Sequence, residues 1–340
     1  MPGFRSRLIR SLSAGVAGAA LAIGVTACGS SGSTAAGSSG GASGDSVTVG
    51  ALANGAATQT DLTVPEVADI RAELPASVVK SGQLVIGVGA LPAGFAPLAY
   101  VGSDQKTLTG AEPDLGRLVA AVLGLRPVLQ NATWENMFVG LDSGKTDVLF
   151  SNVTDTEERK KKYDFASYRQ DNLAFEVLKS STWSFGGDYH SLAGKTVAVS
   201  SGTNQEKILL EWQSKLKAEG KQLTISYYPD PNAIYLALTS GRIDASFGPN
   251  PGIAYQITQK AGSPDPVRNA GTYSGAGESL QGLIAATAKK DSGLAKPVAD
   301  ALNHLIQDGQ YAKWLAAWNL ANEAVPSSQI NPPGLPLSNS

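Results

Sequence analysis

Apolar residues recur between residues 84 and 150 with two different spacings. The run 84–88 (Leu-Val-Ile-Gly-Val) is uninterrupted, which is typical of a parallel strand buried on both faces. After Pro113, apolar residues follow at i, i+3, i+4, i+7 and i+8 up to Gly124, and this spacing predicts an amphipathic helix that ends at the glycine. A strand at 127–130, a helix at 134–141 and a strand at 147–150 then complete a βαβαβ unit.

The same alternation returns later in the chain. The predicted strands are 196–200, 223–227 and 243–247, and the predicted helices are 205–219 and 232–240. Two successive βαβαβ units predict an α/β fold with two Rossmann-like lobes and mostly parallel sheets. We expect 78–174 and 281–321 to form lobe 1 and 175–280 to form lobe 2. The two hinge crossings are expected near 173–176 and 279–283.

A short repeat supports two similarly built lobes. The stretches LDSGKTDVLF, from Leu141, and LTSGRIDASF, from Leu238, share the pattern L-x-S-G-[KR]-x-D-x-x-F. Each predicts a helix end, a glycine stop and a strand that begins at an aspartate. We interpret Asp147 and Asp244 as structural residues at the strand starts.

The two ends of the chain have a different composition. Residues 1–27 combine a basic start with a short stretch of Leu, Ala, Gly and Val, the pattern of a secretory signal peptide. Cys28, the only cysteine, follows Val-Thr-Ala and resembles the lipobox cysteine of bacterial lipoproteins, which is lipidated. The resemblance implies an extracytoplasmic protein anchored to the membrane at Cys28. The alternative is an ordinary signal peptide with a chance cysteine.

Residues 28–77 are interpreted as a tether and N-terminal extension. Ser, Gly, Ala and Thr dominate 29–44, so this part predicts a flexible tether. The part from 45 to 77 is a continuation of the tether or an extension with a short helix near 64–74. Four prolines in 322–340 predict a flexible tail.

Composition limits the classes of function. A formal net charge of −2 gives no reason to expect nucleic acid or anionic lipid as a partner. The two histidines, His190 and His304, follow no predicted site element, and no metal-ligand spacing or Ser/His/Asp grouping occurs. The sequence therefore predicts neither a cofactor nor a metal. It also predicts no enzyme.

Polar residues follow two of the predicted strands, where open α/β sheets bind their ligands. Ser151, Asn152 and Thr154 come after 147–150 and precede Arg159, and the run 201–204 (Ser-Gly-Thr-Asn) comes after 196–200 and opens a helix. Hydroxyls and a helix N-terminus favour an anion, and a guanidinium matches a carboxylate in bidentate fashion. The alternatives are a surface salt bridge of Arg159 with Glu157 or Asp164, and a plain helix cap at 202–203.

Residues 84–320 resemble the polar-amino-acid family of ABC-transporter substrate-binding proteins, which have a type II periplasmic-binding fold. The landmarks occur in order, and they are Phe95-Ala96-Pro97, Leu108-Thr109-Gly110, Trp134, Thr154-x-Thr156-x-x-Arg159, Gly202-Thr203, Gly241-Arg242-Ile243-Asp244-Ala245 and Asp308-Gly309-Gln310-Tyr311. The resemblance implies a monomer that binds a small carboxylate-bearing solute between its lobes and delivers it to a membrane permease.

The same resemblance implies roles for individual residues. Arg159 would bind the ligand's carboxylate, with Thr154 and Thr203 donating hydrogen bonds and Gly202 beside them. The backbone carbonyl of Asn152, next to Ser151, would meet the ligand's amine. Phe95 and Trp134 would enclose the ligand's side chain, although Trp134 can also be read as core packing.

Two prolines depart from the family pattern. Pro249 stands where family members carry an acid, after the strand of the second lobe, that pairs with the ligand's α-ammonium, and Pro92 stands at the family's other acidic position, near the first strand. Either another acid substitutes, with Glu278, Glu112 and Glu206 as candidates, or the ligand is not a standard α-amino acid. Asn250 would in that case orient a neutral group.

Two other functions remain as alternatives. One is a ligand-sensing module for a signalling partner. The other is a dehydratase-like enzyme on the same fold, for which Glu278 is the candidate catalytic carboxylate.

Overall fold

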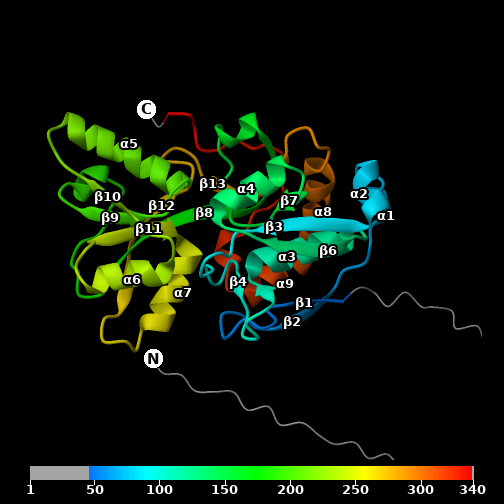
Figure 1. Ribbon diagram of the computed structural model, residues 1–340, viewed down its shortest axis with the longest axis horizontal. Coiled ribbons are helices and arrows are strands. Elements are labelled where there is room, and N and C mark those ends of the chain that lie inside the picture. The colour runs from blue at the N-terminus through cyan, green and yellow to red at the C-terminus, as the bar shows by residue number, and fades with distance from the viewer. Residues whose placement is uncertain (1–45, 339–340) are drawn as a thin grey trace, which may run out of the picture. The chain divides into compact units, whose positions relative to one another are not determined.

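The computed structural model describes residues 46–338, so the predicted signal peptide, Cys28 and the tether at 29–44 lie outside the described residues. In the described part, nine strands form one sheet in the order β10-β9-β11-β8-β13-β7-β3-β6, with β12 paired to β8. Figure 1 shows helices on both sides of this sheet. None of the helices between 46 and 338 is both long and apolar enough to cross a membrane.

Lobe 1 is built around β3 (Gln83–Val88), which is parallel to both of its neighbours, β6 (Arg126–Asn131) and β7 (Val148–Leu149). Leu84, Ile86 and Val88 are fully buried on one face of β3, and on the other face Gly87 is buried and Val85 is half-buried. The helices of this lobe are α3 (Ala111–Val122), α4 (Trp134–Asp142), α8 (Ala295–Gln307) and α9 (Gln310–Ala317).

Lobe 2 repeats this arrangement around β9 (Thr196–Val199), which is parallel to β10 (Thr224–Tyr227) and β11 (Ala245–Pro249). Its helices are α5 (Asn204–Ala218), α6 (Pro231–Thr239) and α7 (Asn250–Lys260). In both lobes the first strand of the unit lies between the second and the third. The predicted two-lobed α/β fold is therefore confirmed.

The repeated stretches form the same corner in each lobe. The Asp147 carboxylate accepts the Val85 N–H at 2.8 Å, and the Asp244 carboxylate accepts the Thr196 N–H at 2.8 Å. Each aspartate therefore accepts a backbone N–H of the central strand of its lobe. Both residues thus have the structural role that the sequence predicted.

One long strand connects the lobes. β8 (Tyr163–Leu178) pairs with β13 (Gly282–Lys289) up to Asp171, and with β11 from Leu173 onward. The chain returns to lobe 1 between β12 (Val267–Ser274) and β13. Figure 1 shows β8 running from one group of strands to the other. These crossings lie next to the positions predicted for the hinge.

The described part of the N-terminal extension is packed against lobe 1 rather than extending the tether. β1 (Ser46–Val49) and β2 (Thr60–Thr63) form a hairpin, and two short helices follow, α1 (Ala68–Arg71) and α2 (Ala76–Ser81). Val49 and Val64 are fully buried. The Gly50 N–H also donates to Asp114 of α3 at 2.7 Å. The apolar residues that alternate along this segment pack it against lobe 1, although small residues are frequent in it.

The predicted flexible tail is also wrong for residues 322–338. A short 3-10 helix (Ala321–Glu323) begins the segment, and backbone hydrogen bonds then join Gln329 to Ser167 and Leu335 to Asp155. Leu335 is fully buried in the hydrophobic core of lobe 2. The prolines prevent a regular helix or strand in this segment. The extended chain is nevertheless held on the two lobes by buried side chains and by hydrogen bonds of its backbone.

Candidate ligand-binding site

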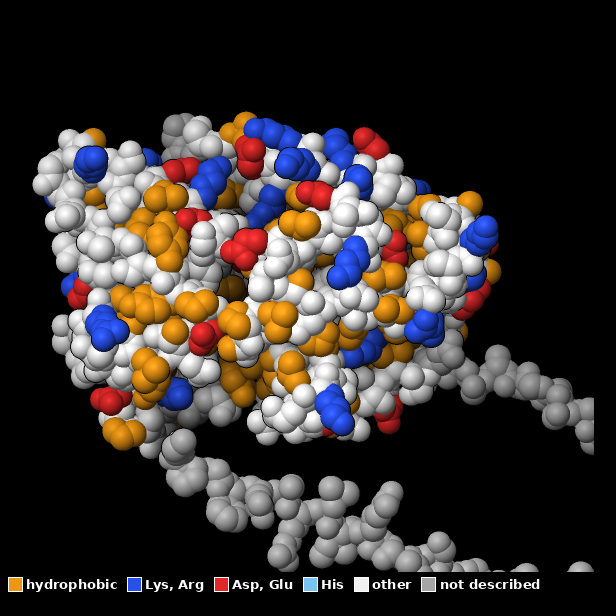
Figure 2. Space-filling model, in the orientation of Figure 1, with side chains coloured by type: hydrophobic (Ala, Val, Ile, Leu, Met, Phe, Trp, Pro, Cys, Tyr) orange, Lys and Arg blue, Asp and Glu red, His pale blue; other side chains and the backbone are white. Residues whose placement is uncertain are grey.

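A cavity of about 500 Å³ lies between the two lobes. Much of its wall follows directly on the parallel strands of both lobes, with Gly89 after β3, Ser151 after β7, Ser200 after β9 and Tyr228 after β10, and Pro249 closes β11. The cavity therefore lies at the carboxyl ends of the strands, where the sequence predicted a site. Figure 2 shows hydrophobic side chains across this face of the molecule, between α6 and α3.

The structure brings about half of the predicted site residues to the cavity wall. The wall includes Phe95, Trp134, Ser151, Asn152 and Thr203, together with Pro92 and Pro249. Arg159, Thr154, Gly202, Asn250 and Glu278 lie outside it.

Arg159 contacts residues of the wall and of both lobes. Its Nη1 donates to the Thr154 carbonyl at 2.8 Å, and its Nη2 donates to the Gly202 carbonyl at 3.3 Å. The guanidinium carbon is 5.4 Å from the centroid of the Trp134 ring and 5.6 Å from that of Phe138. Arg159 therefore adjoins the cavity at its aromatic side.

Arg159 takes part in none of the ion pairs found within residues 46–338. Glu157 pairs instead with Lys160, and Asp164 accepts hydrogen bonds from Asp291 and Asn331. The surface-salt-bridge interpretation of Arg159 is therefore wrong. Burial lowers the pKa of Arg159 to about 10, because desolvation disfavours its charge more than the distant carboxylates of Asp171 and Asp155 favour it. A half-buried guanidinium that pairs with no carboxylate of the described residues is suited to an anionic ligand.

The Thr154 hydroxyl is already used within the protein. It donates to the Asp171 carboxylate at 2.7 Å, and Asn204 donates to the same oxygen at 3.0 Å. Burial raises the pKa of Asp171, against the lowering effect of these two donors. Thr154 consequently positions Asp171 in this structure, and its proton is not free for a ligand.

Thr203 caps helix α5. Its hydroxyl donates to the Ser200 carbonyl at 2.7 Å and accepts the Glu206 N–H at 3.2 Å. The cap interpretation of this residue is correct, but Thr203 and the next two residues also line the cavity. The N-terminus of α5, with its positive end of the helix dipole, therefore meets the cavity.

The aromatic residues join the lobes. The Trp134 indole donates to the Gly202 carbonyl at 3.1 Å, across the interface between α4 and lobe 2. The Phe95 ring packs on Gly252 of α7, where a Cβ would overlap the ring. Both predicted aromatic residues thus lie at the contact between the lobes.

The remaining candidate site residues differ in exposure and in their hydrogen bonds. Glu278 is exposed, and Glu206 accepts the Gly202 N–H at 2.6 Å. The Asn250 side chain accepts a hydrogen bond from Asn269 at 3.3 Å. Among the three acids suggested as substitutes for Pro249, the wall contains Glu112.

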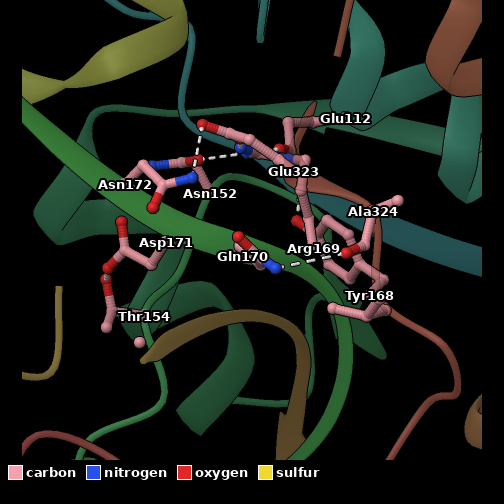
Figure 3. Close-up of polar contacts among 12 residues, drawn as sticks. Glu112, Asn152, Thr154, Tyr168, Arg169, Gln170, Asp171, Asn172, Glu323 and Ala324 are labelled. Carbon is pink, nitrogen blue, oxygen red and sulfur yellow. Dashed lines mark hydrogen bonds and ion pairs between the residues drawn. The ribbon is translucent and has the colours of Figure 1, made fainter. Parts of the chain in front are cut away.

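The sequence interpretation missed a buried charge network at the hinge. Arg169 of β8 is 1% exposed and pairs with Glu112 at 2.8 Å and with Glu323. Its guanidinium also donates to the Asn152 side chain, and the Tyr168 hydroxyl donates to Glu112. Figure 3 shows this network around β8. Burial alone would lower the pKa of Arg169, but Glu323 and Glu112 outweigh it and raise the pKa.

A signal for this network was present in the sequence. The strand YDFASYRQDNLAFEVL carries the polar run Arg169-Gln170-Asp171-Asn172 between two stretches rich in apolar and aromatic residues. Charged residues are rarely buried without partners. Their occurrence inside a strand of this kind predicts buried partners, although it does not say which ones.

Comparison with known proteins gives a consistent result. Residues 86–321 match the model of the bacterial extracellular solute-binding proteins, family 3. The L-cystine-binding protein TcyJ of Escherichia coli is 31% identical over 248 residues, which cover 71% of this chain and 85% of the relative. The arginine-binding protein ArgT of Corynebacterium glutamicum is 28% identical over 271 residues, covering 79% and 84%.

A solved structure shows the same fold. An ancestral arginine-binding protein bound to arginine superposes with a TM-score of 0.59 at 26% identity, covering 70% of this chain and 98% of that one. The packed tail at 322–338 lies beyond the residues that match the family model.

Proposed function

Because the chain belongs to the family 3 bacterial extracellular solute-binding proteins, we propose that it captures a small carboxylate-bearing solute and delivers it to the permease of an ABC importer. The solute is an amino acid or a relative of one. TcyJ and ArgT are named as binding proteins for cystine and arginine, which supports a ligand of this size and kind.

The observation that carries this proposal is the state of Arg159 beside the cavity. Its guanidinium is half-buried, lies beside the Trp134 ring and takes part in none of the ion pairs found in residues 46–338. A ligand carboxylate would supply the missing charge in bidentate geometry. The N-terminus of α5 adds a second favourable element for an anion.

The rest of the cavity favours an organic ligand with apolar parts. Phe95, Trp134 and Tyr228 line it together with Pro92 and Pro249. The prolines carry neither a charge nor an N–H, so an ammonium group that faced them would remain unpaired. We therefore propose that the ligand's cationic or polar group meets the protein elsewhere in the cavity.

Membrane attachment is part of the same proposal. A lipidated Cys28 would hold the protein at the outer face of the membrane, and residues 29–44 would give it reach. Cys28→Ala should release the protein from the membrane fraction without changing ligand affinity. Wild-type protein that carries no label after growth with a radioactive fatty acid would contradict the anchor.

A thermal-shift screen tests the ligand class. The library contains amino acids, amines and small carboxylates, together with the amide of each carboxylate as a matched control. A ligand at 100 times its Kd stabilises the folded state by about 2.7 kcal/mol, so a true ligand should raise Tm and its amide should not. If amides and carboxylates raise Tm equally, the proposed role of Arg159 is wrong.

A further inference from the structure

The C-terminal tail, residues 322–338, is first held on lobe 1. Asn303 of α8 donates to the Ser328 carbonyl at 3.1 Å, and the Ser328 N–H donates back to the Asn303 side chain at 2.8 Å. Further along, the Asn331 side chain accepts the Phe165 N–H of β8 at 2.9 Å, and the Asn331 N–H donates to the Phe165 carbonyl at 3.0 Å. These contacts fix the path of the tail on lobe 1 as far as residue 331.

The next part of the tail runs along the segment 154–160 of lobe 1. The Leu335 N–H donates to the Asp155 carbonyl at 3.2 Å, and the Glu157 N–H donates to the Leu335 carbonyl at 3.0 Å. The Gly334 N–H donates to the Glu157 carboxylate at 3.0 Å, and a Cβ at Gly334 would lie 2.4 Å from the Asp155 carbonyl oxygen. The two backbones are therefore in direct contact, and a larger residue at 334 would push the tail away.

The end of the tail contacts lobe 2. The Leu335 side chain is fully buried in the hydrophobic core of lobe 2, in the same cluster as Ile208 and Trp212 of α5. Lys207 of the same helix donates to the Pro336 carbonyl. Leu335 thus pairs with lobe 1 through its backbone and packs in lobe 2 through its side chain.

The two elements that the tail joins also meet beside the cavity. Arg159, in the segment that the tail follows, donates to the Gly202 carbonyl at 3.3 Å, just before α5 of lobe 2. An opening of the lobes that separates Arg159 from Gly202 must therefore also draw α5 away from the tail, unless Leu335 leaves the core of lobe 2. Exposing a buried leucine side chain to water is unfavourable, so the tail opposes this movement.

We propose that residues 332–336 form a latch, which ties the segment 154–160 of lobe 1 to α5 of lobe 2 and favours the closed arrangement of the lobes. Gly334 and Leu335 are positioning residues, because neither is among the residues of the cavity wall. The latch lies beyond residues 86–321, which match the family model. It acts in the ligand-free chain, so the inference goes beyond the proposed function and does not depend on which solute binds.

The distance between spin labels on the two lobes measures the closed fraction without any ligand. Val139 of α4 and Leu236 of α6 have exposed side chains, and both helices begin at the cavity wall, one on each lobe. Val139→Cys and Leu236→Cys, in a Cys28→Ser background of the full chain, provide the two labelling sites. Double electron–electron resonance then gives the populations of short and long distances between the labels.

Leu335→Ala should raise the ratio of long to short distances about tenfold, because most of the apolar contact of the latch with lobe 2 is lost. Gly334→Ala should raise the same ratio, since its Cβ would push the tail off the Asp155 carbonyl. Leu337→Ala removes an exposed side chain of the same tail and should leave the ratio unchanged. Leu223→Ala, in the same core of lobe 2, should lower the free energy of unfolding without changing the ratio.

The outcomes separate a latch from ordinary packing. An unchanged ratio in Leu335→Ala overturns the inference. An equal rise in Leu223→Ala also overturns it, because the effect would then follow from a weaker core of lobe 2. Should Leu335→Ala fail to fold, Gly334→Ala decides, because it leaves no cavity in either lobe, and an unchanged ratio in that variant overturns the inference. The proposed binding function is tested separately by the thermal-shift screen.

Discussion

The two lobes share one corner and differ in the residues that come after it. Gly144 and Gly241 both end a helix with positive φ, at 72° and 69°. Asp147 and Asp244 then exchange backbone and side-chain hydrogen bonds with the central strand, all at 2.8 Å. The repeated sequence pattern therefore fixes a repeated geometry up to the start of the strand.

Beyond the corner the lobes diverge. In lobe 1 the strand ends at Leu149 and the chain continues through Ser151 and Asn152 toward Arg159. In lobe 2, β11 extends to Pro249 and passes directly into α7. Lobe 1 thus carries Arg159 and Glu112 beside the cavity, whereas lobe 2 contributes Asp230 at the cap of α6, a helix N-terminus, prolines and the surface on which lobe 1 closes. The two lobes therefore share the geometry of the corner, and the residues that follow it give each lobe its own chemistry beside the cavity.

The largest expected effect comes from removing the positive charge that Arg159 of lobe 1 places beside the cavity. Arg159→Ala should weaken ligand binding by about 2–5 kcal/mol, because the ligand's carboxylate would lose a desolvated partner. Arg159→Lys should recover part of the loss, since an ammonium cannot reproduce the bidentate contact. Calorimetry with the ligand found in the screen measures both.

The matched control lies in lobe 2. Arg242 is exposed in the equivalent corner, and Arg242→Ala should leave the affinity unchanged. Equal losses for Arg159→Ala and Arg242→Ala would mean that general electrostatic attraction, rather than a specific contact, governs binding.

Local patterns predicted the corner and the strand ends, but not the long-range charge pairs. Asp147 and Asp244 could be assigned because the pattern occurs twice. Arg169 and Glu323 are 154 residues apart, and no local spacing connects them. The tail was misread because its prolines were taken as a sign of flexibility, whereas Leu335 is buried. Thr154 was assigned to a ligand because its partner, Asp171, was not recognised as buried.

Buried carboxylates offer a second test, because each lobe contains one with a strongly raised pKa. Burial raises the pKa of Asp155 and of Glu176 to about 7, despite the nearby Lys160 and the Ser246 hydroxyl respectively. The folded state therefore binds protons that the unfolded state releases near pH 4, and stability falls as pH rises from about 4 through 7. Asp155→Asn and Glu176→Gln should each stabilise the protein at pH 8, by an amount on the order of 3 kcal/mol.

Urea denaturation at several pH values measures this effect. Each variant should show a flatter curve between pH 5 and 7.5 than the wild type. At pH 3, where the folded and unfolded wild-type groups are both largely protonated, the gain should be small. A variant that keeps the full wild-type slope contradicts the assignment for that residue. If the two variants gain different amounts of unfolding free energy, the larger gain identifies the lobe whose buried carboxylate costs more stability.

A third change sharpens the comparison at the contact between the lobes. Gly252 of α7 packs against Phe95, and a Cβ there would overlap the ring. Gly252→Ala should weaken ligand binding by about 1–3 kcal/mol, because overpacking opposes closure. Phe95→Leu in the same protein should restore the closed form, as measured by small-angle X-ray scattering with ligand.

Gly262→Ala provides the control for that experiment. Gly262 lies just after α7, and nothing approaches the position of its Cβ within 4 Å. This variant should bind and close as the wild type does. Closure that is unaffected by Gly252→Ala would show that the contact with Phe95 is not part of the closed state.

The smallest expected effect tests the shared corner itself. Asp147→Ala and Asp244→Ala each leave a strand N–H without its acceptor, at Val85 and at Thr196 respectively. A buried unsatisfied N–H costs about 1–3 kcal/mol, and water can replace the acceptor where the site is open. The Asp244 side chain is 45% exposed, whereas burial is sufficient to raise the pKa of Asp147. Asp147→Ala should therefore destabilise its lobe more, and hydrogen exchange should accelerate more at the Val85 amide than at the Thr196 amide. Asp147→Asn keeps an acceptor oxygen and should restore most of the protection. If exchange accelerates equally at both amides, the two aspartates contribute equally to the stability of their lobes.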